Sequence, residues 1–188
     1  MRYFTADLHL GHANIIGYSH RPFATVEEMN DALVARWNDT VGDGDEVWVL
    51  GDVAMGRVAE SLPLAARLAG RKHLVPGNHD RCWPGHRHVR AADVRMYEDA
   101  GFEVHGAEVA LTIAGRDVVA CHFPVAGDSH DEDRFVEHRP VLGEGVWLLH
   151  GHVHERWRVH ERQVNVGVDV WDYRPVSEDE VAALIDAG

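Results

Sequence analysis

Short apolar runs, separated by polar and glycine-containing segments, recur along the whole chain. Runs of about four to eight residues bounded in this way are typical of buried β-strands. The pattern predicts strands at RYFTA (2–6), EVWVL (46–50), KHLVP (72–76), EVALTIA (108–114), RDVVAC (116–121), VWLLH (146–150) and QVNVGV (163–168).

The segment between the first two runs has a helical period instead. Its apolar residues from Val26 to Val41 recur at helical spacing, which places them on one face of a helix. Thr25 and Glu28 form a capping-box pattern at the start, and Gly42 follows the last apolar position. We therefore expect one amphipathic helix here.

Further helices are expected in three places. One covers residues 57–69, with Pro63 as an unfavourable residue in its first turns, and another covers about 91–100. Ser177 and Glu180 repeat the capping-box pattern and predict a last short helix. Helices and strands alternate at first and strands dominate later, which favours a layered α/β or α+β fold over a β-sandwich or a bundle.

The length and composition fit one soluble domain. With 188 residues, of which 45% are hydrophobic and 26% charged, the chain is interpreted as a single domain spanning residues 1–188. No apolar run approaches the roughly 20 residues of a membrane helix, and the N-terminus shows no export signal. Cys82 and Cys121 are interpreted as reduced thiols. We expect a cytoplasmic protein without membrane contact.

The net charge argues against a generic nucleic-acid-binding protein. The formal charge is −13, whereas a generic binder of nucleic-acid phosphates would be basic.

Residues 124–145 fit no regular element, and a connection of that length is typical of a functional or mobile segment. Within it, DSHDED (128–133) is interpreted as a solvated acidic loop. Among the 15 histidines, those without a partner at useful spacing are interpreted as exposed: His20, His73, His86, His88, His105, His130, His138 and His160.

Polar side chains follow five of the expected strands at their carboxyl ends. In open α/β sheets, the crevice outside those ends is where ligands bind. A random scatter of polar residues would not select this position five times. The residues placed there are Asp7 and His9; Asp52; Asn78, His79 and Asp80; His122; and His152 and His154.

The spacing within two of these groups favours a metal site. Asp7 and His9 are two residues apart, so on extended backbone they point to the same side and can bind one ion. His152 and His154 repeat that arrangement. A set of imidazoles, carboxylates and one amide oxygen suits Mn, Fe, Zn, Ni or Co better than Mg or Ca, and it lacks the thiolates of a structural zinc site.

The number of candidate ligands indicates two ions. Seven ligands exceed one four-coordinate site but fit two ions that share a bridging carboxylate. Two ions about 3.5–4 Å apart assist in-line displacement at phosphorus, because they generate hydroxide from a bound water and neutralise phosphate oxygens. They would also attract an anion to an acidic protein. Gly51, Gly77 and Gly151 precede or begin the ligand turns, where a missing side chain permits close backbone approach.

These motifs resemble the calcineurin-like metallophosphoesterase family. The signature of that family is D-x-H, G-D, G-N-H-[DE], H and G-H-x-H. This chain shows ADLH, GD, GNHD, CH and GHVH in the same order, from residue 7 to residue 154. A lone D-x-H or GD carries little weight, whereas all five motifs in order form a strong match that covers most of the chain.

The resemblance implies a fold and a role for each ligand. The implied fold is a four-layer αββα sandwich, in which two mixed β-sheets pack face to face and are flanked by helices. The first ion would be held by Asp7, His9 and His154, the second by Asn78, His122 and His152, with Asp52 bridging the two. His79 would face the substrate and protonate the leaving oxygen. Asp80 is grouped with it as a candidate catalytic residue, and both Asp52 and Asp80 are candidates to orient its ring.

The opening string FTADLHLGHANIIGYSHRPF is similar to compact bacterial and phage-encoded members of that family. It places His12 and Asn14 just beyond the first metal ligands, as candidate substrate contacts. Arg21 is a further candidate, because a guanidinium can bind phosphate oxygens bidentately. A structural role for Arg21 in this turn is an equally good interpretation.

The expected function is hydrolysis of a small phosphodiester, such as a nucleotide or related organic phosphate, by in-line attack of a metal-bound hydroxide. Two divalent ions would be the cofactors, with Mn²⁺ as the first choice and Fe, Zn, Ni or Co as alternatives. A DNA or RNA nuclease using Arg81, Arg87 and Arg90, or a phosphomonoesterase, would use the same site. Nucleic acid is not the favoured partner, and a non-catalytic metal-binding module is less favoured still.

Overall fold

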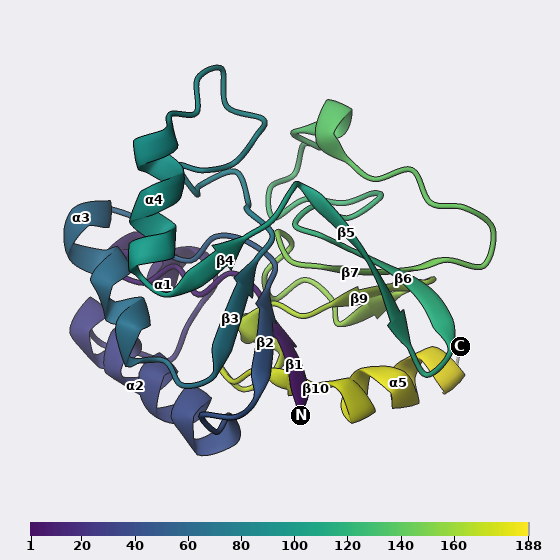
Figure 1. Ribbon diagram of the computed structural model, residues 1–188, viewed down its shortest axis with the longest axis horizontal. Helices are drawn as coiled ribbons and strands as arrows, with labels where there is room; N and C mark the ends of the chain where they lie inside the picture. Colours follow the sequence, from purple (N-terminus) through teal and green to yellow (C-terminus); the bar gives the residue numbers. More distant parts are fainter. Residues whose placement is uncertain (188) are drawn as a thin grey trace.

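The computed structural model describes residues 1–187, which form two five-stranded sheets (Figure 1). In the first sheet the strand order is β10-β1-β2-β3-β4, with β1 to β4 parallel and β10 antiparallel to β1. Its strands are β1 (Arg2–Thr5), β2 (Glu46–Val49), β3 (Arg71–Leu74), β4 (Phe102–Val104) and β10 (Val176–Ser177). Because β1, β2 and β3 are parallel, the loops that follow them lie at the same edge of the sheet.

The second sheet is also mixed. Its strand order is β5-β6-β7-β9-β8, with β6, β7 and β9 parallel and the edge strands β5 and β8 antiparallel to their neighbours. Its strands are β5 (Glu108–Ile113), β6 (Arg116–Cys121), β7 (Trp147–His150), β8 (Val159–His160) and β9 (Gln163–Asn165).

Four helices lie on the outer face of the first sheet, and the fifth lies across one end of the two sheets (Figure 1). The four are α1 (Ala13–Tyr18), α2 (Val26–Thr40), α3 (Val58–Ser61) and α4 (Ala91–Asp99). The fifth, α5 (Glu178–Ala187), contacts β10, β1 and β5. Short 3₁₀ segments cover Leu62–Arg67, Val136–His138 and Val168–Val170.

The alternation of side chains along β2 explains the layers. Val47 and Val49 face the helices and pack in one core with Trp37 of α2. Trp48 and Leu50 point the other way, into a second core between the two sheets. The expected fold class, with helices and two mixed sheets packed face to face, is confirmed.

Loops cover the outer face of the second sheet. Cys121 and Leu148 point outward from this sheet and pack against Trp83 and Phe135. Trp83 comes from the loop before α4, and Phe135 from the long segment 124–145. The helices of the expected sandwich therefore flank the first sheet, whereas this layer of the second sheet is built from loop segments.

The capping signals identified in the sequence are confirmed. The Thr25 hydroxyl accepts a hydrogen bond of 3.1 Å from the backbone N–H of Glu28, at the start of α2. At the start of α5, Ser177 and Glu180 exchange the two bonds of a capping box. Local hydrogen bonds thus set the first residues of both helices.

The structure departs from the sequence pattern at short elements. The helix expected over 57–69 is an α-helix for one turn and then becomes 3₁₀ from Leu62 to Arg67, because Pro63 lacks an amide hydrogen. The strands β4, β8 and β10 and the helix α1 were not expected. Each spans between two and six residues, which is too few to show a period.

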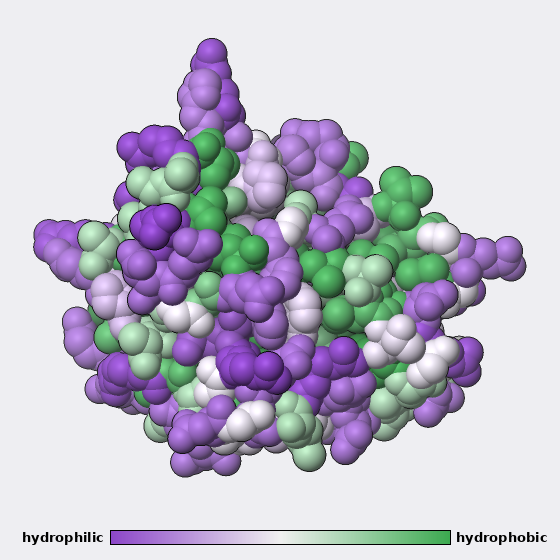
Figure 2. Space-filling view, in the orientation of Figure 1, coloured by the Kyte–Doolittle hydropathy of each residue, from purple (hydrophilic) through white to green (hydrophobic). Residues whose placement is uncertain are grey.

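The surface of the molecule is mixed in character. Figure 2 shows hydrophilic residues in the middle of this face, over β2 and β3, and hydrophobic residues beside them, over β5.

Cys82 and Cys121 are free and buried. Among the described residues, no helix combines the length and the apolar character needed to cross a membrane.

Candidate metal centre

The candidate site lies where strands from both sheets end (Figure 1). Backbone hydrogen bonds join the loops after β1 and β2: the N–H of Asp7 donates to the Gly51 carbonyl (3.1 Å), and that of His9 to the Asp52 carbonyl (2.9 Å). The loop after β7 is joined to them by the His152 N–H, which donates to Asp7 Oδ2 (2.9 Å). The polar strand ends identified in the sequence therefore meet.

Five of the candidate ligands adopt the left-handed backbone conformation. Their φ angles are 57° for Asp7, 51° for His9, 57° for Asp52, 71° for His152 and 50° for His154. Residues other than glycine are uncommon in this region, and such backbone strain concentrates at functional sites. The expectation that the pair Asp7 and His9 and the pair His152 and His154 lie on extended backbone is wrong. Turns, and not strand alternation, direct these side chains into the site.

Glycines allow the ligand loops to approach one another. A Cβ atom at Gly51, whose φ is +87°, would lie 2.5 Å from Nδ1 of His122. A Cβ atom at Gly151 would lie 2.6 Å from Oδ2 of Asp7, and Gly77 is enclosed as tightly. The role expected for the three glycines, close backbone approach around the ligands, is confirmed.

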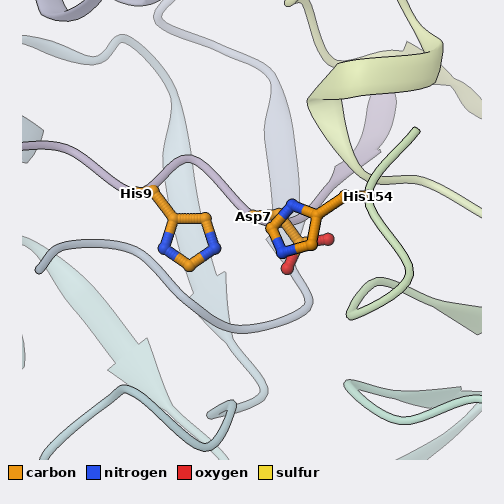
Figure 3. Close-up of side chains that lie close together, drawn as sticks. All are labelled: Asp7, His9 and His154. Carbon is orange, nitrogen blue, oxygen red and sulfur yellow. The ribbon is translucent and has the colours of Figure 1, made fainter. Parts of the chain in front are cut away.

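Asp7, His9 and His154 form a first group of ligands (Figure 3). One donor atom of each residue lies within 4.8 Å of the others. The imidazole rings of His9 and His154 are stacked, with centroids 5.1 Å apart, and Figure 3 shows the Asp7 carboxylate next to the His154 ring. All three residues are buried. They are the residues that the resemblance assigned to the first ion.

A second group surrounds His122. Asp7, Asp52 and His122 offer donor atoms within 4.8 Å of one another. The side-chain oxygen of Asn78 lies 3.1 Å from Nε2 of His122, and Nδ1 of His152 lies 3.3 Å from the same nitrogen. All five residues are buried. The ligands that the resemblance assigned to a second ion are thus brought together as well.

Asp52 lies between the two groups. Its Oδ2 atom is 3.6 Å from Nε2 of His122 and 3.7 Å from Nε2 of His9. Two donors that share an ion at about 2.0–2.2 Å are about 3–3.5 Å apart, so a shift of a few tenths of an ångström would bring this oxygen within reach of both ions. Asp7 also belongs to both groups. Two carboxylates therefore stand between the two positions.

Unpartnered buried atoms show that the donor set fits divalent metal ions. Oδ1 of Asp7 and both ring nitrogens of His9 are buried without a hydrogen-bond partner among the described residues. Burial raises the pKa of Asp7 to about 6 and lowers the pKa of His152 to about 4. A dication held by these atoms would supply the missing partner and stabilise the carboxylate form.

Two buried carboxylates contact His152 and His154 on the ring nitrogens that face away from the candidate metal positions. Nε2 of His152 lies 3.0 Å from Oδ2 of Asp128, so its Nδ1 is turned toward the second group. Nδ1 of His154 lies 3.2 Å from Oδ2 of Asp169, which leaves its Nε2 for the first group. Such contacts fix the orientation of a ligating imidazole and raise its basicity.

Neither carboxylate was identified from the sequence. Asp128 is 3% exposed, so the interpretation of its surroundings as a solvated acidic loop is wrong at this residue. Burial alone would raise the pKa of Asp128, but hydrogen bonds from His152 and Arg134 hold it below its usual value. Asp169 directly follows the apolar run 163–168, so the strand-end rule could have found it. Asp128 carries no comparable signal.

Arg21 is a structural residue. Its guanidinium donates to both carboxylate oxygens of Asp169 (2.8 and 2.9 Å). It also donates to the carbonyls of Asp7 (2.7 Å) and Leu8 (3.0 Å). The expected contact with substrate is wrong, because Arg21 is 3% exposed and its donors are used within the fold. It connects the loop after β1 to the carboxylate that orients His154.

Asp80 positions loops and does not face the substrate. Its fully buried carboxylate accepts backbone N–H bonds from Asp52 (2.8 Å), Val53 (3.1 Å) and Gly77 (2.9 Å). Burial, with the charge of Asp52 second, raises the pKa of Asp80 to about 7. Its assignment as a catalytic residue is wrong. Asp52 accepts the backbone N–H of His79 (3.0 Å), and among the described residues no hydrogen bond joins Asp52 or Asp80 to the ring of His79.

A pocket of about 430 Å³ borders the metal centre, and the ring of His79 lines it. His12 and Asn14 form part of its wall, as expected, and their contact with substrate stays a prediction. Another part of the wall comes from the segment 124–145, through side chains that include Arg134. This arginine was not identified from the sequence, where nothing distinguishes it from a surface residue.

Sequence comparison finds relatives that match nearly the whole chain. The Gene 66 protein of Mycobacterium phage L5 is 34% identical over 209 residues, covering 98% of this chain and 93% of the relative. The chain belongs to the Gene 66 protein family. The Gene 66 protein of Mycobacterium phage D29 is 34% identical over 194 residues, with coverage of 98% and 95%. The uncharacterized protein MJ1445 of Methanocaldococcus jannaschii is 29% identical over 198 residues, with coverage of 99% and 92%.

One solved structure shares the fold of this chain over nearly its whole length. A protein of unknown function from Aquifex aeolicus, AQ665, superimposes with a TM-score of 0.71 at 23% identity, over 98% of both chains. The phosphoesterase YfcE from E. coli is a more distant neighbour, with a TM-score of 0.42 at 16% identity over 88% of this chain and 77% of its own. No family model matches the chain.

Proposed function

We propose that this Gene 66 family member is a metal-dependent phosphoesterase with two divalent ions, and that its preferred substrates are small phosphodiesters. The observation that carries the proposal is the convergence of seven buried donor residues in two groups, with Asp52 between them. Two divalent ions held by these residues would supply an activated water molecule and neutralise the charge of the phosphate during in-line displacement at phosphorus.

The protein's own groups have separate tasks in this proposal. The ring of His79 lines the pocket and is not one of the ligands, so it is available to stabilise the transition state and to protonate the leaving oxygen. Asp128 and Asp169 hold His152 and His154 in the orientation that ligation needs. Asp80 fixes the backbone on which Asp52 is carried.

The pocket supports a small substrate. Its volume of about 430 Å³ lies within the range of roughly 300–1,000 Å³ that is typical of small-molecule sites. Arg134 is the one cationic side chain other than histidine that lines it, so it is the candidate contact for a phosphate oxygen. A formal charge of −13 disfavours a long polyanion.

The test is hydrolysis of bis-p-nitrophenyl phosphate and of the p-nitrophenyl monoester by chelator-treated protein with and without Mn²⁺. We expect Mn²⁺-dependent turnover that is faster on the diester. The variant His79→Ala should keep its metal content and lose about 10²–10⁴-fold in rate, which is the usual contribution of a general acid. The exposed His88 provides the control His88→Ala, which should leave the rate unchanged.

Other outcomes of the same assay assign other functions. Absence of turnover of both esters with Mn²⁺, Fe²⁺, Zn²⁺, Ni²⁺ or Co²⁺ would refute the proposal and leave a metal-binding module. Preference for the monoester would make the protein a phosphomonoesterase. Cleavage of oligonucleotides that weakens steeply with salt would indicate a nuclease that binds the phosphate backbone.

A further inference from the structure

A second cluster of metal-ligating side chains lies on the first sheet, outside the site described above. The cross-strand register pairs Trp48 of β2 with His73 of β3, and His73 with Glu103 of β4, so the three form one row on the face toward the second sheet. His105 lies two residues beyond Glu103, on the same face. The row lies on the face of the first sheet that packs against the second sheet. Toward the edge of the sheet, the side chains on this face are polar and no longer apolar.

Two imidazole nitrogens and the carboxylate of Glu103 converge in this cluster. Nδ1 of His73 is 3.0 Å from Nε2 of His105 and 3.4 Å from a carboxylate oxygen of Glu103. Nε2 of His105 is 3.7 Å from the other oxygen of Glu103. Donors at about 2.0–2.1 Å from a tetrahedral zinc ion are about 3.3–3.4 Å apart, and the separations of 3.0 and 3.4 Å from Nδ1 of His73 lie close to that value.

The surroundings favour ligation over a simple ion pair. Burial lowers the pKa of His73, although Glu46 and Glu103 oppose that shift. The other nitrogen of His73 is buried without a hydrogen-bond partner among the described residues and faces Glu46 at 3.7 Å. The ring is held in place by Trp48, which stacks on it with centroids 4.6 Å apart.

We propose that His73, Glu103 and His105 form a second metal site, which binds one Zn²⁺ ion and leaves a fourth position for water. Two imidazoles and one carboxylate are a ligand set that zinc uses where one position stays open. The site joins β3 to β4, the short edge strand that ends at Val104. It corrects the sequence interpretation, in which His73 and His105 were exposed residues without partners.

The test measures how many zinc ions the protein binds and which residues are needed to bind them. Protein loaded with Zn²⁺ and freed of excess metal is analysed for bound zinc, beside the variants His73→Gln, Glu103→Gln and His105→Gln and the control His88→Gln. Each of the three variants should bind one equivalent less than the wild type, and the control should bind the same amount. Glu103, whose side chain is 68% exposed, can be replaced without disturbing the core, so its variant remains informative if His73→Gln fails to fold.

Trp48 provides a second readout of the proposed site. The chain has six tryptophans, so Co²⁺ bound beside Trp48 should quench a part of the total fluorescence, and that part should be lost in Glu103→Gln and in Trp48→Phe. The hydrolytic rate with Mn²⁺ should be the same in Glu103→Gln as in the wild type, which separates this proposal from the proposed function. Equal zinc content in the wild type and in folded Glu103→Gln and His105→Gln would overturn the proposal and leave a hydrogen-bonded histidine pair.

Discussion

Asp128 connects two parts of the site, because its carboxylate contacts the ring of His152 and the guanidinium of Arg134. We expect Asp128→Asn to weaken binding of the second ion about 10–100-fold, the usual effect of losing the carboxylate behind a ligating histidine. The hydrolytic rate should therefore fall at low Mn²⁺ and recover in part at high Mn²⁺. The measurement is a Mn²⁺ titration of activity.

Asp131 gives a matched control for this prediction. It lies in the same segment, and its side chain is fully exposed. Asp131→Asn removes the same charge without touching a ligand, so its Mn²⁺ titration should match that of the wild type. Identical titrations for Asp128→Asn and the wild type would show that the contact with His152 does not support metal binding.

At the residue scale, the candidate ligands were easier to identify from the sequence than the residues that hold them in position. Asp7, Asp52 and His122 were identifiable because each follows an apolar run, and strand ends meet at one edge of a sheet. The sequence left the role of Arg21 open and misjudged Asp128, because both roles depend on partners 148 and 24 residues away in the chain. No local pattern records such contacts.

The turn after β7 carries two candidate ligands, His152 and His154, and Gly151 sets its shape. A methyl group at this position would meet Oδ2 of Asp7 and Cβ of Ala6 at 2.6 Å. Gly151→Ala should therefore cost about 1–3 kcal/mol of unfolding free energy, as overpacking does, and should lower the bound Mn²⁺. Urea unfolding and metal analysis measure the two effects.

Gly17, in α1, is the control for this substitution. Nothing lies within 4 Å of a Cβ added there. Gly17→Ala should leave the bound Mn²⁺ unchanged and stabilise the protein by about 0.5–1 kcal/mol through helix propensity. If Gly151→Ala behaves like Gly17→Ala, close packing at this turn does not shape the site.

The cap of α5 makes stability depend on pH. The hydrogen bond from Arg174, which is the largest cause, and those from Ser177 lower the pKa of Glu180 from 4.5 to about 2. Since the folded pKa lies below the unfolded one, this stabilisation is complete above about pH 4.5 and is lost as the pH falls toward 2. Urea unfolding between pH 6 and 3 should show a smaller decrease in stability for Glu180→Gln than for the wild type.

Asp186, which is exposed on the same helix, provides the comparison. Asp186→Asn should retain the pH dependence of the wild type, because this carboxylate makes no contact in the described structure that is lost on protonation. A Glu180→Gln curve parallel to the wild type would mean that the cap does not contribute to acid sensitivity.

At the element scale, prediction succeeded where a local signal specifies the structure. The helix from Val26 to Thr40 has the Thr25 N-cap and a long helical period, and both can be read from the sequence. The strand Phe102–Val104 is defined by its pairing with β3, which adjacent residues do not encode. Pro63 signalled an irregularity but not its form, which is a 3₁₀ segment from Leu62 to Arg67.

For the molecule as a whole, the two sheets together position the candidate ligands. The first sheet supplies Asp7, Asp52 and Asn78, and the second supplies His122 and His152. Neither sheet holds a complete donor set alone, so formation of the site depends on their packing. Ions that bind here should therefore stabilise the packed state by mass action.

Anomalous diffraction from crystals of the protein loaded with Mn²⁺ tests the central claim most directly. We predict two peaks about 3.5–4 Å apart, one beside His9 and His154 and the other beside His122, with the carboxylate of Asp52 between them. A map from fully loaded crystals without a peak among these side chains would contradict the account.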